Sequence, residues 1–154
     1  MTFTIPAPLK LEHEELHADL VKATQAGGRV GDAANAVASV LHDHFVKEEQ
    51  FALPPLGLLS RLARDQVDAD IKNVLPMTDR LKTELSEMLD EHKAVVAALK
   101  TLITAAEADN KPEHARFAEK LMLHAQTEDE VLYPAAILIG NYIKLRLKAS
   151  STIA

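Results

Sequence analysis

The stretch LHDHFVKEEQFALPP (residues 41–55) recurs 80 residues later as LMLHAQTEDEVLYPA (residues 121–135). The two copies share a histidine, a glutamate and a proline at the same spacing, namely His44, Glu48 and Pro54 in the first and His124, Glu128 and Pro134 in the second. An internal repeat of this kind indicates a fold built from similar units. Packing alone does not demand polar residues at matching positions, so the repeat points to a shared chemical site.

A second match joins the segments that precede these copies. EHEELHADL (residues 12–20) aligns with EHKAVVAAL (residues 91–99) at an offset of 79, which places His13 on His92. Each half of the chain therefore supplies one histidine from a first segment and an H-x-x-x-E motif from a second.

Four segments carry apolar residues at the spacing of helices that face a shared core. The first segment runs from Pro8 to Ala26, and the second continues from the following turn to Leu53. The third begins after Pro76 and ends at the turn at Asp109, and the fourth continues from that turn to Tyr133 and Pro134. Glycines 27, 28 and 31 are expected to form the first turn. The sequence thus predicts an all-α, up-and-down four-helix bundle, a single domain over residues 1–154 whose core spans about residues 8–134.

Two segments lie outside these four helices. Residues 56–75 join the second and third helices and predict short helical turns, and residues 135–148 predict an apolar C-terminal helix. The sequence leaves three roles for these segments. They could cover the open side of the bundle, form a dimer contact or gate a site. Both a monomer and a homodimer fit the sequence.

Composition narrows the class of protein. The formal charge is −6 and lysines and arginines form no cluster, so nucleic acid is not an expected partner. The chain has no cysteine, which excludes disulfides, thiolate metal sites and a cysteine nucleophile. Residues 1–10 lack the pattern of a signal peptide, and no apolar run approaches the roughly 20 residues that cross a membrane. We therefore expect a cytoplasmic protein without a membrane partner.

Six polar residues fall on the predicted core stripes: His13, His44, Glu48, His92, His124 and Glu128. A buried carboxylate without a partner costs several kcal/mol, and no lysine or arginine shares these stripes, so a metal is the expected partner. Each histidine lies some 15 residues, or roughly 22 Å, from its predicted turn, so all four imidazoles are expected in one layer. Four imidazoles and two carboxylates suit two ions of iron, with manganese and zinc as alternatives.

These residues resemble those of the hemerythrin-like family, also called the HHE cation-binding domain, and the resemblance spans roughly residues 8–134. It implies a non-haem di-iron centre with oxo or hydroxo and carboxylate bridges inside a four-helix bundle. By motif position His13 and His44 are expected to hold one iron, His92 and His124 the other, with Glu48 and Glu128 as bridges. The oxygen carriers of the family have a further histidine one turn from His92, where this chain has Met88 and Val96.

His17 lies one turn after His13 and is expected either to be a seventh metal ligand or to hydrogen-bond to the ligands. Residues 13–17 (HEELH) also match the H-E-x-x-H pattern of zinc proteases. The extended form of that pattern fails, because Leu20 and Ala23 occupy the positions of its glycine and last histidine. We expect His42 to lie at the surface, His114 to lie at a helix end and Tyr133 to have a packing role.

Several functions remain open for such a centre. The sequence favours a protein that binds dioxygen or a related small oxidant, peroxide or nitric oxide. A redox enzyme of the same centre is the alternative, as is a partner-binding module held together by its metal. Whether the chain is an enzyme is left open by the sequence.

Overall fold

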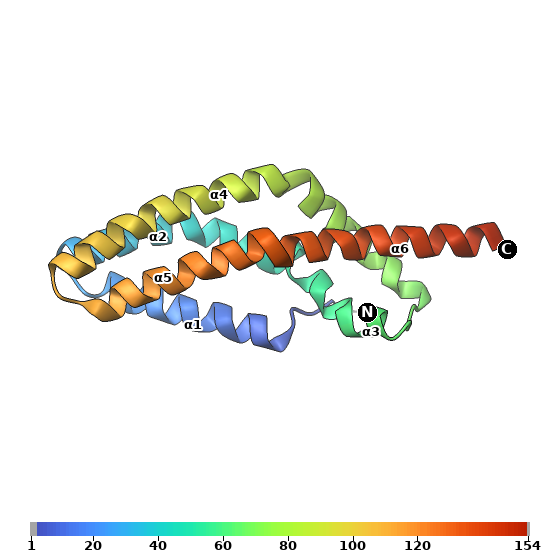
Figure 1. The fold of residues 1–154 in the computed structure, drawn as a ribbon, viewed down its shortest axis with the longest axis horizontal. Coiled ribbons are helices and arrows are strands. Elements are labelled where there is room, and N and C mark those ends of the chain that lie inside the picture. The colour runs from blue at the N-terminus through green and yellow to red at the C-terminus, as the bar shows by residue number, and fades with distance from the viewer. Residues whose placement is uncertain (1–2, 154) are drawn as a thin grey trace.

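The computed structural model describes residues 3–153, and side chains as far as residue 150. Two helical hairpins form the bundle: α1 (Ala7–Thr24) with α2 (Gly28–Lys47), and α4 (Leu75–Ala108) with α5 (Pro112–Thr127). Figure 1 shows the four helices side by side, with both hairpin turns at one end. The described residues contain no strand, so the predicted all-α four-helix bundle is confirmed.

Both hairpin turns use residues with positive φ. Gly27 and Gly28 have φ values of 73° and 56°, and Asn110 has 54° in the second turn. Glycine adopts such angles without a steric penalty, and asparagine tolerates them better than most residues. Gly31, which was expected in the turn, lies instead inside α2 and is buried. The first turn is therefore earlier in the chain than the sequence suggested.

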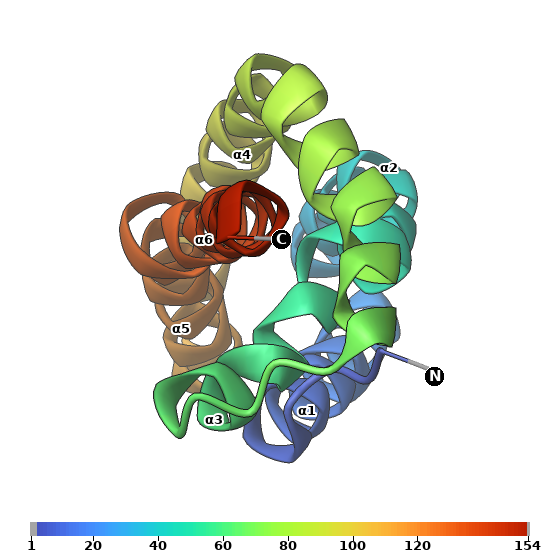
Figure 2. The same cartoon turned by 90° about the vertical axis from the view of Figure 1, so that its right-hand side faces the viewer.

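The remaining elements build a cap at the far end of the bundle. Residues 48–74 contain the π-helical turn η1 (Glu48–Ala52), the 3-10 turns η2 (Pro54–Leu58) and η3 (Ala69–Val74), and the short helix α3 (Leu59–Ala63). After α5 come a second π-helical turn, η4 (Glu128–Leu132), and α6 (Tyr133–Ile153). The fourth helix does not end at Pro134 as expected, because α6 continues the direction of α5 as one long rod (Figure 1). In the end-on view α6 is surrounded by α4, α3 and the segments between them (Figure 2).

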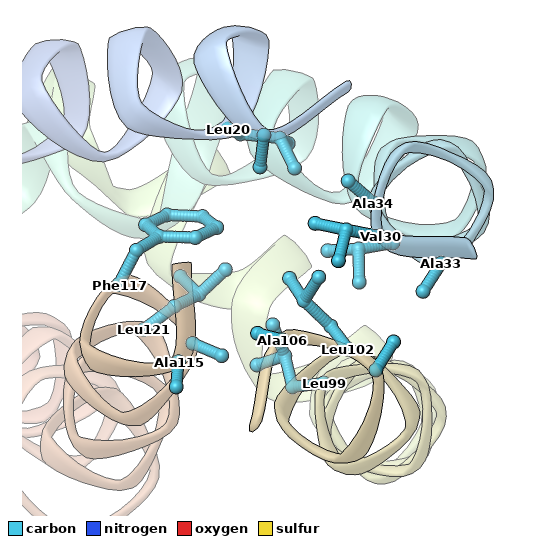
Figure 3. Close-up of a cluster of buried hydrophobic side chains, with 14 of the residues drawn as sticks. Leu20, Val30, Ala33, Ala34, Leu99, Leu102, Ala106, Ala115, Phe117 and Leu121 are labelled. Carbon is cyan, nitrogen blue, oxygen red and sulfur yellow. The ribbon is translucent and has the colours of Figure 1, made fainter. Parts of the chain in front are cut away.

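Two apolar clusters hold this arrangement together. The first lies near the hairpin turns, where Leu20, Val30, Leu102 and Phe117 point towards one another from all four helices (Figure 3). The second joins the cap to the bundle and is formed by residues such as Phe51, Ile71, Met88 and Ile143. Helix α4 contributes to both clusters, whereas α2 and α5 are joined to the second cluster by the π-helical turns that follow them. The buried histidines and glutamates lie on the helices between these clusters.

Candidate metal centre

The buried polar side chains form two groups that share two carboxylates. Cluster A contains His13 and His124, cluster B contains His44 and His92, and both include Glu48 and Glu128. All six side chains are at most 4% exposed. The Nε2 atoms of the two histidines are 3.0 Å apart in cluster A and 2.7 Å apart in cluster B.

The pairing of the histidines differs from the one expected. His13 lies 11 residues before the end of α1 and His124 lies 12 residues after the start of α5, whereas His44 and His92 both lie 16 residues from the turn ends of α2 and α4. At 1.5 Å per residue the two pairs occupy levels about one helical turn apart. The single layer predicted from the sequence is therefore wrong. Each cluster takes one histidine from each half of the chain.

Glu128 connects the two clusters directly. Its Oε2 atom lies 3.5 Å from Nε2 of His13 and 3.3 Å from Nε2 of His124, and its Oε1 atom lies 3.3 Å from Nε2 of His92. Glu48 approaches from the opposite hairpin, with Oε1 at 3.3 Å from Nε2 of His44. One carboxylate thus presents an oxygen to each cluster, as a bridge between two ions requires.

Both shared glutamates begin a π-helical turn. The carbonyl of Glu48 accepts a hydrogen bond from the backbone N–H of Leu53, and the carbonyl of Glu128 accepts one from Tyr133. A proline follows in each case, Pro54 and Pro134. In an α-helix a proline ring collides with the carbonyl four residues earlier, and a wider turn relieves that collision. The repeated proline therefore accounts for the matching local geometry of the two glutamates.

Burial sets the protonation of these groups. It raises the pKa of Glu48 well above its usual value, although the hydrogen bond from Tyr133 acts in the opposite direction. It lowers the pKa of His44 to about 3, assisted by repulsion from His92 and Lys47. Burial also lowers the pKa of His13 and of His124. These three histidines are therefore held in the neutral form that binds metals.

The donor atoms fit a pair of metal ions. Oε1 of Glu48 and Oε2 of Glu128 are buried and have no hydrogen-bond partner among the described residues. Buried polar atoms without partners are rare in proteins and call for an ion or another partner. Two nitrogens about 2.1 Å from one ion and at right angles lie about 3.0 Å apart, which matches the histidine pairs. The two clusters are suited to a dinuclear metal site.

Four acidic residues surround the outer nitrogens of the histidines. Each Nδ1 atom faces one carboxylate: Glu12 hydrogen-bonds to His124 and Asp129 to His92 at 2.5 Å, while Glu91 lies 3.6 Å from His44 and Glu49 lies 3.9 Å from His13. Such carboxylates orient an imidazole and increase its basicity. Sequence reasoning did not assign these four acids to the site. The repeat held the signal, because an acid adjoins His13, Glu48, His92 and Glu128 at matching positions.

Tyr133 is the other residue whose role was underestimated. Its hydroxyl is buried and donates a hydrogen bond to Oε2 of Glu48 at 3.0 Å, and it lies 3.2 Å from Nε2 of His44 and 3.3 Å from Nε2 of His92. Burial raises the pKa of Tyr133, which keeps its proton on the oxygen. The residue at the matching position of the repeat is Leu53. Cluster B therefore has a hydroxyl group that the repeat does not supply to cluster A.

The remaining histidines lie outside both clusters. His17, expected on the inward stripe, is exposed on α1. His42 is also exposed, as expected, and both line a groove between α1 and α2. His114 lies near the start of α5, beside Glu113. Of the seven predicted metal ligands, the structure brings together all except His17.

The fold and the site together define a helical-bundle protein with two buried clusters of imidazoles and shared carboxylates, suited to a dinuclear metal site. The model of the family described as the hemerythrin HHE cation binding domain matches residues 4–136, so the chain belongs to this family. Comparison with curated proteins and with solved structures yields no match. None of the helices in the described part of the chain is both long enough and apolar enough to span a membrane.

Proposed function

We propose that this protein holds two iron ions and uses them to bind dioxygen or a related small oxidant, peroxide or nitric oxide. His13 and His124 would hold one ion, His44 and His92 the other, and Glu48 and Glu128 would bridge them. The observation that carries the proposal is the pair of buried carboxylate oxygens without partners, shared by two histidine pairs. Iron in a ligand set of this kind binds such molecules and exchanges electrons with them.

The protein's own residues would prepare this centre in three ways. Burial keeps the imidazoles of His13, His44 and His124 neutral, so that their Nε2 atoms are free to bind metal. The outer carboxylates fix the direction of each ring. The two ions would receive two imidazoles each and share two carboxylates, which leaves fewer than six protein ligands per ion. A small molecule could then take a remaining position.

Turnover of peroxide or nitric oxide is the second candidate, and Tyr133 favours it. Its hydroxyl lies within 3.3 Å of two histidine nitrogens of cluster B and keeps its proton. A donor in that place can hydrogen-bond to a small ligand or transfer a proton to it. Peroxide consumption that depends on Tyr133 would support turnover, and a stable, reversible oxygen adduct would support binding.

Metal analysis of protein purified without added metal, together with its optical spectrum, tests the proposal. Two irons per chain are expected, and fewer than about one bound metal per chain would contradict a dinuclear centre. Glu128→Ala should lose the paired centre, because this residue faces both clusters. Glu130→Ala is the matched control, since Glu130 is exposed on the same π-helical turn and should retain both ions.

A loss of metal in Glu128→Ala must be separated from a loss of folding. Without metal the variant should be about as stable as the wild type or more so, because a buried carboxyl without a partner is removed. Thermal unfolding of both metal-free proteins measures this difference. A strongly destabilised metal-free variant would show that Glu128 serves the fold rather than a metal.

A further inference from the structure

The two exposed histidines of the first hairpin lie on one groove. This α1–α2 groove has a volume of about 410 Å³ and is lined by His17 and His42 together with Glu14, Phe45 and Glu49. His13 of cluster A lines it as well. The groove therefore extends from the protein surface to a residue of the buried site.

The second hairpin carries the equivalent groove, and its chemistry is different. At the repeat-related positions Lys93 replaces Glu14, Val96 replaces His17, Met122 replaces His42 and Ala125 replaces Phe45. That groove also contains Lys100, whereas no lysine or arginine lines the α1–α2 groove. Because valine and methionine serve at the matching positions, the fold does not require His17 or His42.

His13 forms the wall between the α1–α2 groove and cluster A. Its Nε2 atom faces His124 in the cluster, while its buried Nδ1 atom lacks a hydrogen-bond partner and lies 3.9 Å from Oε1 of Glu49. Glu49 is 57% exposed and lines the groove. Phe45 stacks on the His13 ring, with ring centroids 4.6 Å apart. A carboxylate in solvent thus reaches towards a nitrogen of the buried site.

We propose that the α1–α2 groove is a loading site, where His17 and His42 capture a divalent transition-metal ion from solvent before it enters cluster A. Imidazole binds ions such as Fe²⁺, Co²⁺ and Zn²⁺, and the negative charges of Glu14 and Glu49 attract them. The proposal that an ion is captured here rests only on the residues that line the groove. Transfer inward rests on the proposed dinuclear centre, and it requires Phe45 to move aside from His13.

Titration of the metal-free protein with Co²⁺ tests this proposal, because cobalt absorbs visible light when bound by imidazole and carboxylate. The wild type should bind two tight equivalents and one weaker equivalent. The His17→Gln/His42→Gln double variant should lose the weaker equivalent but keep the two tight ones. Its tight sites should fill more slowly, since the groove loses the imidazoles that hold an ion there before transfer.

The matched control is Val96→Gln/Met122→Gln, which changes the repeat-related positions of the other groove. It should keep the weaker equivalent and the wild-type rate. Two results would overturn the loading site. The first is a wild type that binds no weaker equivalent, and the second is a His17→Gln/His42→Gln variant that equals the wild type in stoichiometry and rate. Failure of the dinuclear centre has a different signature, namely fewer than two tight equivalents in the wild type.

Discussion

At the residue scale, the buried His44 makes the stability of the fold depend on pH. Its ring is fully buried between the bundle helices, and burial lowers its pKa to about 3 from an ordinary value of 6.5. When the pH falls below 6.5, the unfolded chain binds a proton at this residue while the folded chain does not. The stability that the neutral ring contributes is therefore present above that pH and is lost as the pH falls towards 3.

We predict that metal-free His44→Gln is less sensitive to acid than the wild type. Between pH 6 and pH 5 the free energy of unfolding of the wild type should fall more steeply, by about 1.4 kcal/mol per pH unit for this group. Glu48 acts in the opposite direction, since its raised pKa favours the folded state at low pH, but it is present in both proteins. Urea unfolding at the two pH values measures the difference in slope.

Leu41→Ala provides the control for this experiment. Leu41 is buried one turn before His44, and truncating it should lower stability by about 2–5 kcal/mol without removing a titrating group. Its pH slope should equal that of the wild type. Equal slopes for all three proteins would show that His44 does not govern the acid sensitivity.

Sequence reasoning identified the six buried residues of the site, but it misplaced residues near them. The six core histidines and glutamates followed from the repeat and from the cost of burying charge. His17 was placed inward because it lies one turn after His13, but Leu16 and Leu20 define the buried face of α1. Tyr133 was assigned a packing role. The extra residue of the π-helical turn directs its side chain towards Glu48, which α-helical spacing does not predict.

At the scale of elements, α6 is fixed by a close approach to α4. Gly140 faces Thr78, and a β-carbon at residue 140 would lie 2.7 Å from Cβ of Thr78 and 2.3 Å from its Oγ1. Rotation of the threonine side chain does not relieve a clash with its own Cβ. The contact therefore depends on the absence of a side chain at residue 140.

Gly140→Ala should consequently destabilise the protein by about 1–3 kcal/mol, the usual cost of overpacking. Thermal or urea unfolding of the metal-free protein measures the effect. Adding Thr78→Ala shortens the opposing side chain and should restore part of the lost stability. If Gly140→Ala alone is neutral or stabilising, α6 can shift on α4 and the contact does not fix its position.

The element boundaries explain why the four histidines do not share one level as expected from the sequence. The glycines at 27, 28 and 31 suggested a centred turn, and that choice placed His13 level with His44. Gly28 is already helical, so the turn comes earlier and the levels of the four histidines separate into two. Composition alone does not show which glycine ends a turn, because glycine is also compatible with a close helix contact, as at Gly31.

At the scale of the whole molecule, the site joins the two halves of the chain. Each cluster combines a histidine that precedes residue 64 with one that follows it. The exposed loop after α3 contains Arg64 and Asp65, and exposed loops are the preferred sites of limited proteolysis. Neither fragment from a cut at this loop would hold a complete cluster.

We predict that a chain cut by trypsin after Arg64 stays together more firmly with metal than without it. A ligand at 100 times its dissociation constant adds about 2.7 kcal/mol, so the fragments should separate at a lower urea concentration after chelation. Size-exclusion chromatography in increasing urea measures the separation, with the uncut chain as the control. Fragments that separate at the same urea concentration in both states would contradict a metal bond between the halves.

One difference within the repeat, Tyr133 opposite Leu53, would make the two proposed metal positions unequal. Cluster B has a buried oxygen donor beside its histidines, and among the described residues cluster A has no matching hydroxyl. A protonated hydroxyl donates hydrogen bonds and does not replace an imidazole as a ligand, so it would act on a small molecule at one position only. The two ions of the proposed centre should therefore differ in their surroundings, and the duplicated bundle would form an asymmetric site from two similar halves.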